Sequence, residues 1–136
     1  MHTLSLLTQQ FAELSPFFYS RVSPEPLTAP YWVAFNTDLA TELNLDTDFQ
    51  TTANLAYLSG NAPQYAPAPI AGVYSGHQFG VYTPRLGDGR ALLIGDSIDT
   101  AGQRQEWQLK GAGKTPYSRF ADGRAVLRSS IREYLC

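Results

Sequence analysis

Polar and apolar residues alternate most clearly in the second half of the chain. The stretch "EWQLKG" places Trp107 and Leu109 on one side and Gln108 and Lys110 on the other, which predicts a half-buried strand. The preceding "RALLIGDSI" predicts a buried strand, and the aromatic and β-branched "VYSGHQFGVYTPRLG" favours another. The linker "DTAGQRQ" suits a turn between antiparallel strands. Residues 73–111 are therefore predicted to form a three-stranded meander.

Helical spacing of apolar residues occurs near both ends of the chain. In residues 122–135, Leu127, Ile131 and Leu135 share one face of a predicted helix. The amino-terminal "HTLSLLTQQFAEL" shows the same spacing. The carboxy-terminal pattern meets neither glycine nor proline before it stops. We therefore expect the chain to be a fragment of a longer protein.

The segment between these regions is rich in proline and short elements. Four prolines in "SPFFYSRVSPEPLTAP" favour extended or turn structure. "YWVAFNTDLATELNL" is predicted to begin as a strand, with Thr37 or Asp38 capping a short helix from Leu39. "TTANLAYLSG" predicts a helix that Gly60 ends, and "NAPQYAPAPIAG" is a proline-rich connection. We place a boundary there, between an extension of residues 1–70 and a unit of residues 71–136.

The composition is typical of a globular protein and limits the classes of partner to be expected. The 136 residues are 43% hydrophobic and 16% charged, with a formal net charge of −2, so bulk charge favours neither nucleic acid nor an anionic membrane. The only cysteine is Cys136, so no intramolecular disulfide is possible, which fits a reducing compartment. No apolar run approaches the roughly 20 residues of a membrane helix, and no secretory signal is visible. We expect a cytoplasmic protein.

The stretch "LGDGR" permits two interpretations. Asp-Gly between two strands is typical of a tight hairpin, which requires no ligand. Alternatively, Gly87 and Gly89 would let backbone amides approach a phosphate, with Arg90 supplying positive charge. A third glycine is absent, because Leu92 stands at its position. The local residues by themselves favour the plain hairpin.

Lys110 and Glu133 suggest a second site. Lys110 should end the third strand of the meander, and Glu133 lies in the helix that follows. A strand lysine after a glycine loop, followed by a helix with a glutamate, is the arrangement of a protein-kinase amino-terminal lobe. There the lysine holds nucleotide phosphates and the glutamate orients it. The alternatives are a solvated lysine and a surface ion pair of Glu133 with a helix neighbour.

The segment after Lys110 is rich in glycine and arginine. "GAGKTP" is no P-loop, because Gln108 stands where the first glycine is required. The i, i+4, i+8 spacing of Arg124, Arg128 and Arg132 predicts one basic helix face, either solvated or facing an anionic phosphate or an acidic partner. Before it, Asp122 could cap the helix, and Gly123 could let the chain approach a ligand.

The two histidines suggest no metal site. His77 lies in "YSGHQFG" and His2 in the first turn of the chain, so neither has a visible ligating partner, and a structural role is expected for His77.

Four motifs together resemble one family. "YSGHQFG", "RLGDGRALLIGD", "LKGAGKTPYSR" and "DGRAVLRSSIREYL" are similar, in this order, to the amino-terminal part of the SelO (YdiU) family of protein adenylyltransferases. The resemblance is dense from about residue 73 to 136. It implies an α+β fold: a protein-kinase-like amino-terminal lobe with an antiparallel sheet and an αC-like helix, preceded by a helical and irregular extension. It also implies that the carboxy-terminal lobe is missing.

The resemblance further implies the activity and the site. The family transfers AMP from ATP to Ser, Thr and Tyr hydroxyls of proteins, and binds ATP flipped relative to kinases. The residues expected to contact the nucleotide are Gly87, Gly89, Arg90, Lys110, Asp122 and Gly123, with Glu133 as the partner of Lys110.

The catalytic base and the ligands for Mg²⁺ or Mn²⁺ are expected in the missing carboxy-terminal part, so this chain should be inactive by itself. Two other functions remain open. One is a kinase-like phosphotransferase, and the other is a non-catalytic ATP-binding or scaffold module.

Overall fold

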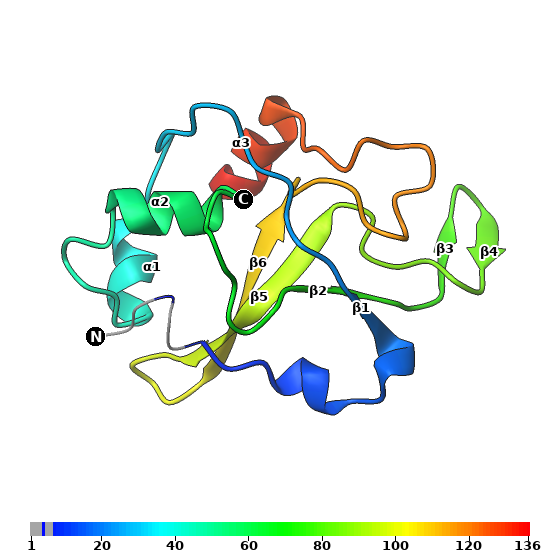
Figure 1. Cartoon of the computed structure of the whole chain (residues 1–136), viewed down its shortest axis with the longest axis horizontal. Helices are drawn as coiled ribbons and strands as arrows, with labels where there is room; N and C mark the ends of the chain where they lie inside the picture. The colour runs from blue at the N-terminus through cyan, green and yellow to red at the C-terminus, as the bar shows by residue number, and fades with distance from the viewer. Residues whose placement is uncertain (1–3, 5–6) are drawn as a thin grey trace.

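The computed structural model describes residue 4 and residues 7–136, and its architecture is α+β (Figure 1). An antiparallel sheet has the order β1-β2-β5-β6, and β3 and β4 form a separate hairpin. The strands are β1 (Tyr19–Arg21), β2 (Ile70–Gly72), β3 (Gly76–Gln78), β4 (Val81–Thr83), β5 (Ala91–Ile98) and β6 (Arg104–Lys110). The helices are α1 (Thr37–Glu42), α2 (Thr52–Leu58) and α3 (Leu127–Leu135), with short 3₁₀ turns at Gln10–Glu13 and Pro16–Phe18.

The two long strands β5 and β6 pair over most of their length, and β6 lies at one edge of the sheet. Ile94 is fully buried, and Leu109 on β6 is 9% exposed. Trp107 is half-buried, whereas Gln108 and Lys110 are exposed, so the alternation expected for this strand is confirmed. Between the strands, the Asp99 carboxylate accepts hydrogen bonds from the amides of residues 101 and 103 and closes the expected turn.

The core lies between this pair and the amino-terminal half of the chain. Its buried members are Leu4, Leu7, Phe49, Ile94 and Leu109, and the helices α1 and α2 lie at the same end of the molecule (Figure 1). The ring of Phe49 packs on Trp107 with centroids 6.2 Å apart. β1 also adds to the sheet through β2. Segments from both sides of the expected boundary at residue 70 thus share one sheet and one core.

A buried carboxylate ties the amino-terminal segment to β5. Asp96 is 2% exposed, and it accepts hydrogen bonds from the Thr8 hydroxyl, the Gln10 amide and the Arg104 guanidinium. Burial by itself raises the pKa of Asp96, but the hydrogen bonds from Thr8 and Gln10 and the charge of Arg104 outweigh it, so the pKa is lowered. Backbone hydrogen bonds in both directions between Thr8 and Asp96 complete this junction.

The predicted meander is wrong in its first strand. The stretch before the glycine loop folds back on itself at Phe79 and Gly80, whose φ angles are +54° and +77°. It therefore forms the β3–β4 hairpin, which stands apart from the main sheet (Figure 1). The strand that pairs with β5 on the side away from β6 is instead β2, and the paired residues are Ile70 and Leu93.

The predicted helix of residues 122–135 begins five residues later, at Leu127. Asp122 does not cap it. Its carboxylate accepts from the amide of Arg124 at 2.9 Å and closes a turn around Gly123, where φ is +73°. Arg124 therefore precedes the helix, and the basic face predicted for Arg124, Arg128 and Arg132 is wrong in its first member.

The amino-terminal predictions are confirmed only in part. The helix predicted for residues 2–14 does not form in the described part of this segment. There the bridge of Thr8 to β5 is followed only by a 3₁₀ turn, Gln10–Glu13. His2 lies outside the described residues. No strand forms at residues 31–36, and Asn36 caps α1, in place of Thr37 or Asp38, by accepting from the amide of residue 39. The helix expected before Gly60 is present as α2.

No helix in the described part of the chain has both the length and the apolar character that crossing a bilayer requires.

Candidate functional site

An ion pair joins the end of β6 to α3. Lys110 Nζ lies 2.8 Å from both carboxylate oxygens of Glu133, and each side chain is about half exposed. The hydrogen bond from Lys110 lowers the pKa of Glu133, and the charges of Lys110, Arg90 and Arg132 act in the same direction. Arg90 is held nearby, because its carbonyl accepts from the amide of Gly111 at 2.7 Å. Positive side chains therefore gather where β5 begins and β6 ends.

The "LGDGR" stretch is a loop and not a hairpin, because β4 does not pair with β5 among the described residues. Asp88 binds Gly72 on β2 twice: its amide donates to the Gly72 carbonyl, and its carboxylate accepts from the Gly72 amide. These contacts, at 2.9 and 2.8 Å, draw the loop toward β2 and away from β4. The hairpin prediction is therefore wrong, because a long-range side-chain contact replaces the local turn.

The segment after β6 packs on this loop. The Thr115 hydroxyl donates to the Asp88 carbonyl, and the Ser118 hydroxyl donates to the Gly89 carbonyl, both at 2.6 Å. A Cβ atom at Gly87 would lie 2.7 Å from the Gly72 carbonyl oxygen and from Cγ of Tyr117. Packing alone therefore requires glycine at Gly87.

The loop still offers donors for a ligand. Among the described residues, the amides of Gly87 and Gly89 donate to no protein acceptor. Both glycines line a pocket of about 370 Å³, together with Arg90 and Gly123. Tyr117 contributes an aromatic wall. Unpaired amides beside an arginine are a suitable surface for an anionic group.

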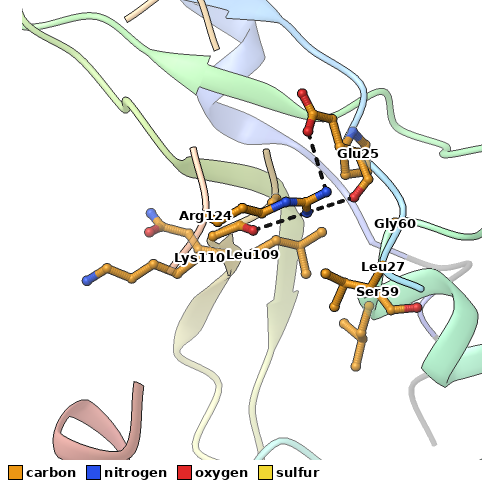
Figure 2. Close-up of a pocket in the computed structure, with 12 residues that line it drawn as sticks. Glu25, Leu27, Ser59, Gly60, Leu109, Lys110 and Arg124 are labelled. Atoms are coloured by element: carbon orange, nitrogen blue, oxygen red, sulfur yellow. Dashed lines mark hydrogen bonds and ion pairs between the residues drawn. The ribbon is translucent and has the colours of Figure 1, made fainter. Parts of the chain in front are cut away.

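Lys110 lies outside that pocket and lines a neighbouring one of about 280 Å³. Figure 2 shows its side chain directed away from Glu25 and Ser59 on the opposite wall. Asp122 lines neither pocket, and Arg124 lines both. The structure therefore brings together Gly87, Gly89, Arg90 and Gly123, and places Lys110 with Glu133 beside them.

Sequence reasoning missed Glu25 altogether. Its carboxylate pairs with Arg124 at 3.4 Å, and its carbonyl accepts from the same guanidinium at 3.1 Å (Figure 2). Glu25 lies in a proline-rich stretch about a hundred residues before Arg124, and no local pattern marks it.

In the part of the chain that the structure describes, no three His, Cys, Asp or Glu side chains are grouped to hold a metal ion.

Comparison with known proteins gives consistent matches. A sequence model described as "Protein adenylyltransferase SelO" matches residues 3–136. The chain is 55% identical over 130 residues to the "Protein nucleotidyltransferase YdiU" of Paraburkholderia xenovorans, covering 93% of this chain and 25% of that protein. The protein of the same name from Thiobacillus denitrificans is 50% identical over 139 residues, covering 100% of this chain and 28% of the relative. The chain thus spans about a quarter of the length of these curated relatives.

Proposed function

The chain belongs to the SelO family, and we propose that it is the amino-terminal part of a protein that transfers AMP from ATP to hydroxyl groups of protein Ser, Thr and Tyr side chains. Its relatives are named protein nucleotidyltransferases, which supports nucleotidyl transfer to a protein as the general activity. We propose that the transferred group is AMP and that it is accepted by hydroxyl groups. We also propose that this part of the protein is a kinase-like lobe.

The observation that carries the proposal is the ion pair of Lys110 and Glu133 next to Arg90. Lys110, Arg90 and Arg132 bring three positive charges near the one negative charge of Glu133, so net positive charge remains for a phosphate. A strand lysine that a helix glutamate orients is the device by which kinase-like lobes hold nucleotide phosphates. We therefore assign Lys110 and Arg90 to the phosphates, with Glu133 orienting Lys110.

The remaining contacts are proposed around the pocket of about 370 Å³. We propose that the amides of Gly87 and Gly89, which donate to no acceptor among the described residues, donate to phosphate oxygens. Gly123 lines the same pocket, and the adjacent Asp122 is exposed. We propose that Asp122 and Gly123 contact the nucleotide from this side.

In the proposed reaction the hydroxyl oxygen of the substrate forms a bond to the α-phosphorus of ATP. The bond from that phosphorus to the oxygen bridging to the β-phosphate breaks, and pyrophosphate leaves. The hydroxyl proton passes to a base that we place in the part of the protein outside this chain, together with the ligands for Mg²⁺ or Mn²⁺. This chain alone is therefore expected to bind nucleotide but not to transfer AMP.

ATP binding tests the proposed site. We expect Lys110→Ala to weaken ATP binding, measured by calorimetry with magnesium, by at least about tenfold, because a charge-assisted contact to phosphate is lost. Lys114→Ala is the matched control, because Lys114 is exposed and only its backbone amide forms a hydrogen bond among the described residues. Equal affinity in all three proteins would contradict the assignment of Lys110.

The reaction itself requires the full-length protein. Incubation with ATP labelled at the α-phosphate should label protein substrates, whereas ATP labelled at the γ-phosphate should not. Transfer of the γ-label would establish the phosphotransferase alternative and refute AMP transfer.

A further inference from the structure

We propose that Arg124 is a positioning residue for the nucleotide site and that Glu25, in the amino-terminal extension, is its partner. The inference rests on the proposed function, because it concerns the turn at Asp122 and Gly123 that is assigned to the nucleotide. Arg124 itself is not assigned a contact with ATP.

The guanidinium of Arg124 binds oxygen atoms of two segments that lie far apart in the sequence. Its guanidinium donates to the carbonyls of Glu25 at 3.1 Å, Pro26 at 3.2 Å and Gly111 at 3.5 Å. The ion pair with the Glu25 carboxylate adds a further contact at 3.4 Å (Figure 2). A planar guanidinium has five N–H donors in a fixed arrangement and can serve several acceptors at once, which a lysine ammonium cannot match in geometry.

Glu25 is bound to the segment that follows β6 at both its backbone and its side chain. Its amide donates to the Ala112 carbonyl at 2.8 Å, and its carboxylate accepts from the Lys114 amide at 3.2 Å. Residues 25–26, 111–114 and 122–124 are therefore connected as one unit, which we call the Arg124 junction.

The segments of the Arg124 junction lie too close for side chains between them. The amide of Gly113 donates to the Gly123 carbonyl at 3.1 Å. A Cβ atom at Gly123 would lie 1.9 Å from the Gly113 carbonyl oxygen, and one at Gly113 would lie 2.6 Å from Cγ of Glu25. Because the segments are in direct contact at Gly113 and Gly123, a displacement of one should displace the others.

The Arg124 junction is directly continuous with the proposed site. The amide of Arg124 donates to the Asp122 carboxylate and thereby closes the turn that holds Gly123 against the pocket. Three residues after Arg124 the chain enters α3, which carries Glu133, the partner of Lys110. Loss of the guanidinium should therefore shift both the Asp122–Gly123 turn and the start of α3.

The first test is steady-state AMP transfer by the full-length protein carrying Arg124→Gln. We expect the KM for ATP to rise about five- to twentyfold while kcat changes less, because Arg124 positions the binding turn and touches no reacting atom. Arg124→Lys should show a smaller rise, because one ammonium can replace only part of the contacts. Glu25→Gln should change KM in the same direction by a smaller factor, and it serves if Arg124→Gln does not fold.

Arg21→Gln is the matched control. Arg21 also donates to a main-chain carbonyl, that of Ala68 at 3.1 Å, but it lies on β1 at the sheet edge opposite β6 (Figure 1). If the role of Arg124 is structural alone, Arg124→Gln should lower the thermal stability but leave the KM for ATP as unchanged as Arg21→Gln does. That result would overturn the inference.

Amide hydrogen exchange tests the Arg124 junction without nucleotide. Exchange at residues 111–125 should be at least about fivefold faster in Arg124→Gln than in wild type and unchanged in Arg21→Gln. If the full-length wild-type protein binds no ATP, the proposed function fails, and this exchange pattern still decides whether Arg124 positions the turn. Unchanged exchange in Arg124→Gln would refute the positioning role.

Discussion

Substitution of Asp96 by Asn should strongly destabilise the fold. One carboxylate oxygen accepts from both Thr8 and Arg104, and the other accepts from the Gln10 amide. Asn has a similar shape but only one acceptor oxygen, so its NH₂ group must face an N–H or O–H donor. Arg104 would also lose the negative charge with which it forms an ion pair.

The size of the effect follows from burial. Breaking a buried ion pair costs about 3–5 kcal/mol, and we expect the lower end, because Asp96 is 2% exposed but Arg104 is 41% exposed. For a chain of this size, 1 kcal/mol corresponds to roughly 3–4 °C in melting temperature. Asp96→Asn should therefore lower the melting temperature by about 10 °C at neutral pH.

Thermal unfolding followed by circular dichroism measures this effect, and Asp99→Asn is the matched control. Asp99 accepts three hydrogen bonds as Asp96 does, but in the exposed turn between β5 and β6, so its substitution should cost much less. A similar loss in both variants would contradict the role of burial.

The pH dependence gives a second check on Asp96. Its pKa in the folded chain is lowered from the ordinary value of 3.8, so the unfolded chain takes up this proton more readily than the folded chain. The stabilisation is complete above about pH 4 and is lost as the pH falls through the folded pKa. The difference between wild type and Asp96→Asn should therefore shrink below about pH 4, and a difference that stays constant under acid conditions would refute this account.

Two further predictions concern the site. Gly87→Ala should destabilise the chain by more than about 2 kcal/mol, because its Cβ would clash with Gly72 and Tyr117. Gly80→Ala, also at positive φ but with no atom within 4 Å of the new Cβ, should cost only about 1 kcal/mol; equal losses in chemical denaturation would contradict the packing argument. In an NMR titration the Glu133 carboxyl should have a pKa below its ordinary 4.5, and Lys110→Met should raise it. An unchanged pKa in that variant would show that the ion pair does not persist in solution.

The long strands β5 and β6 could be predicted from the sequence because their signal is local. The apolar run of β5 and the alternation in β6 follow from which side chains face the core, and the turn between them from short-range hydrogen bonds of Asp99. The strand beside β5 could not be predicted in the same way. β2 has three residues and follows a proline-rich stretch, and its place depends on pairing with β1, about fifty residues earlier.

The start of α3 and the role of Arg124 were mispredicted for a related reason. The spacing of Arg124, Arg128 and Arg132 is helical, but the turn closed by Asp122 keeps Arg124 outside the helix. Its side chain is held by carbonyls of Glu25 and Pro26, which no periodicity can reveal.

These contacts give the amino-terminal extension a part in the proposed chemistry. A lobe defined only by its glycine loop, strand lysine and helix glutamate would not need residues 1–70. In this chain those residues supply β1, three of the five described buried members of the core cluster, and two of the carbonyls that accept from Arg124. Nucleotide affinity should therefore depend on Glu25, which lies across a neighbouring pocket from Lys110, as well as on the residues that face the phosphates.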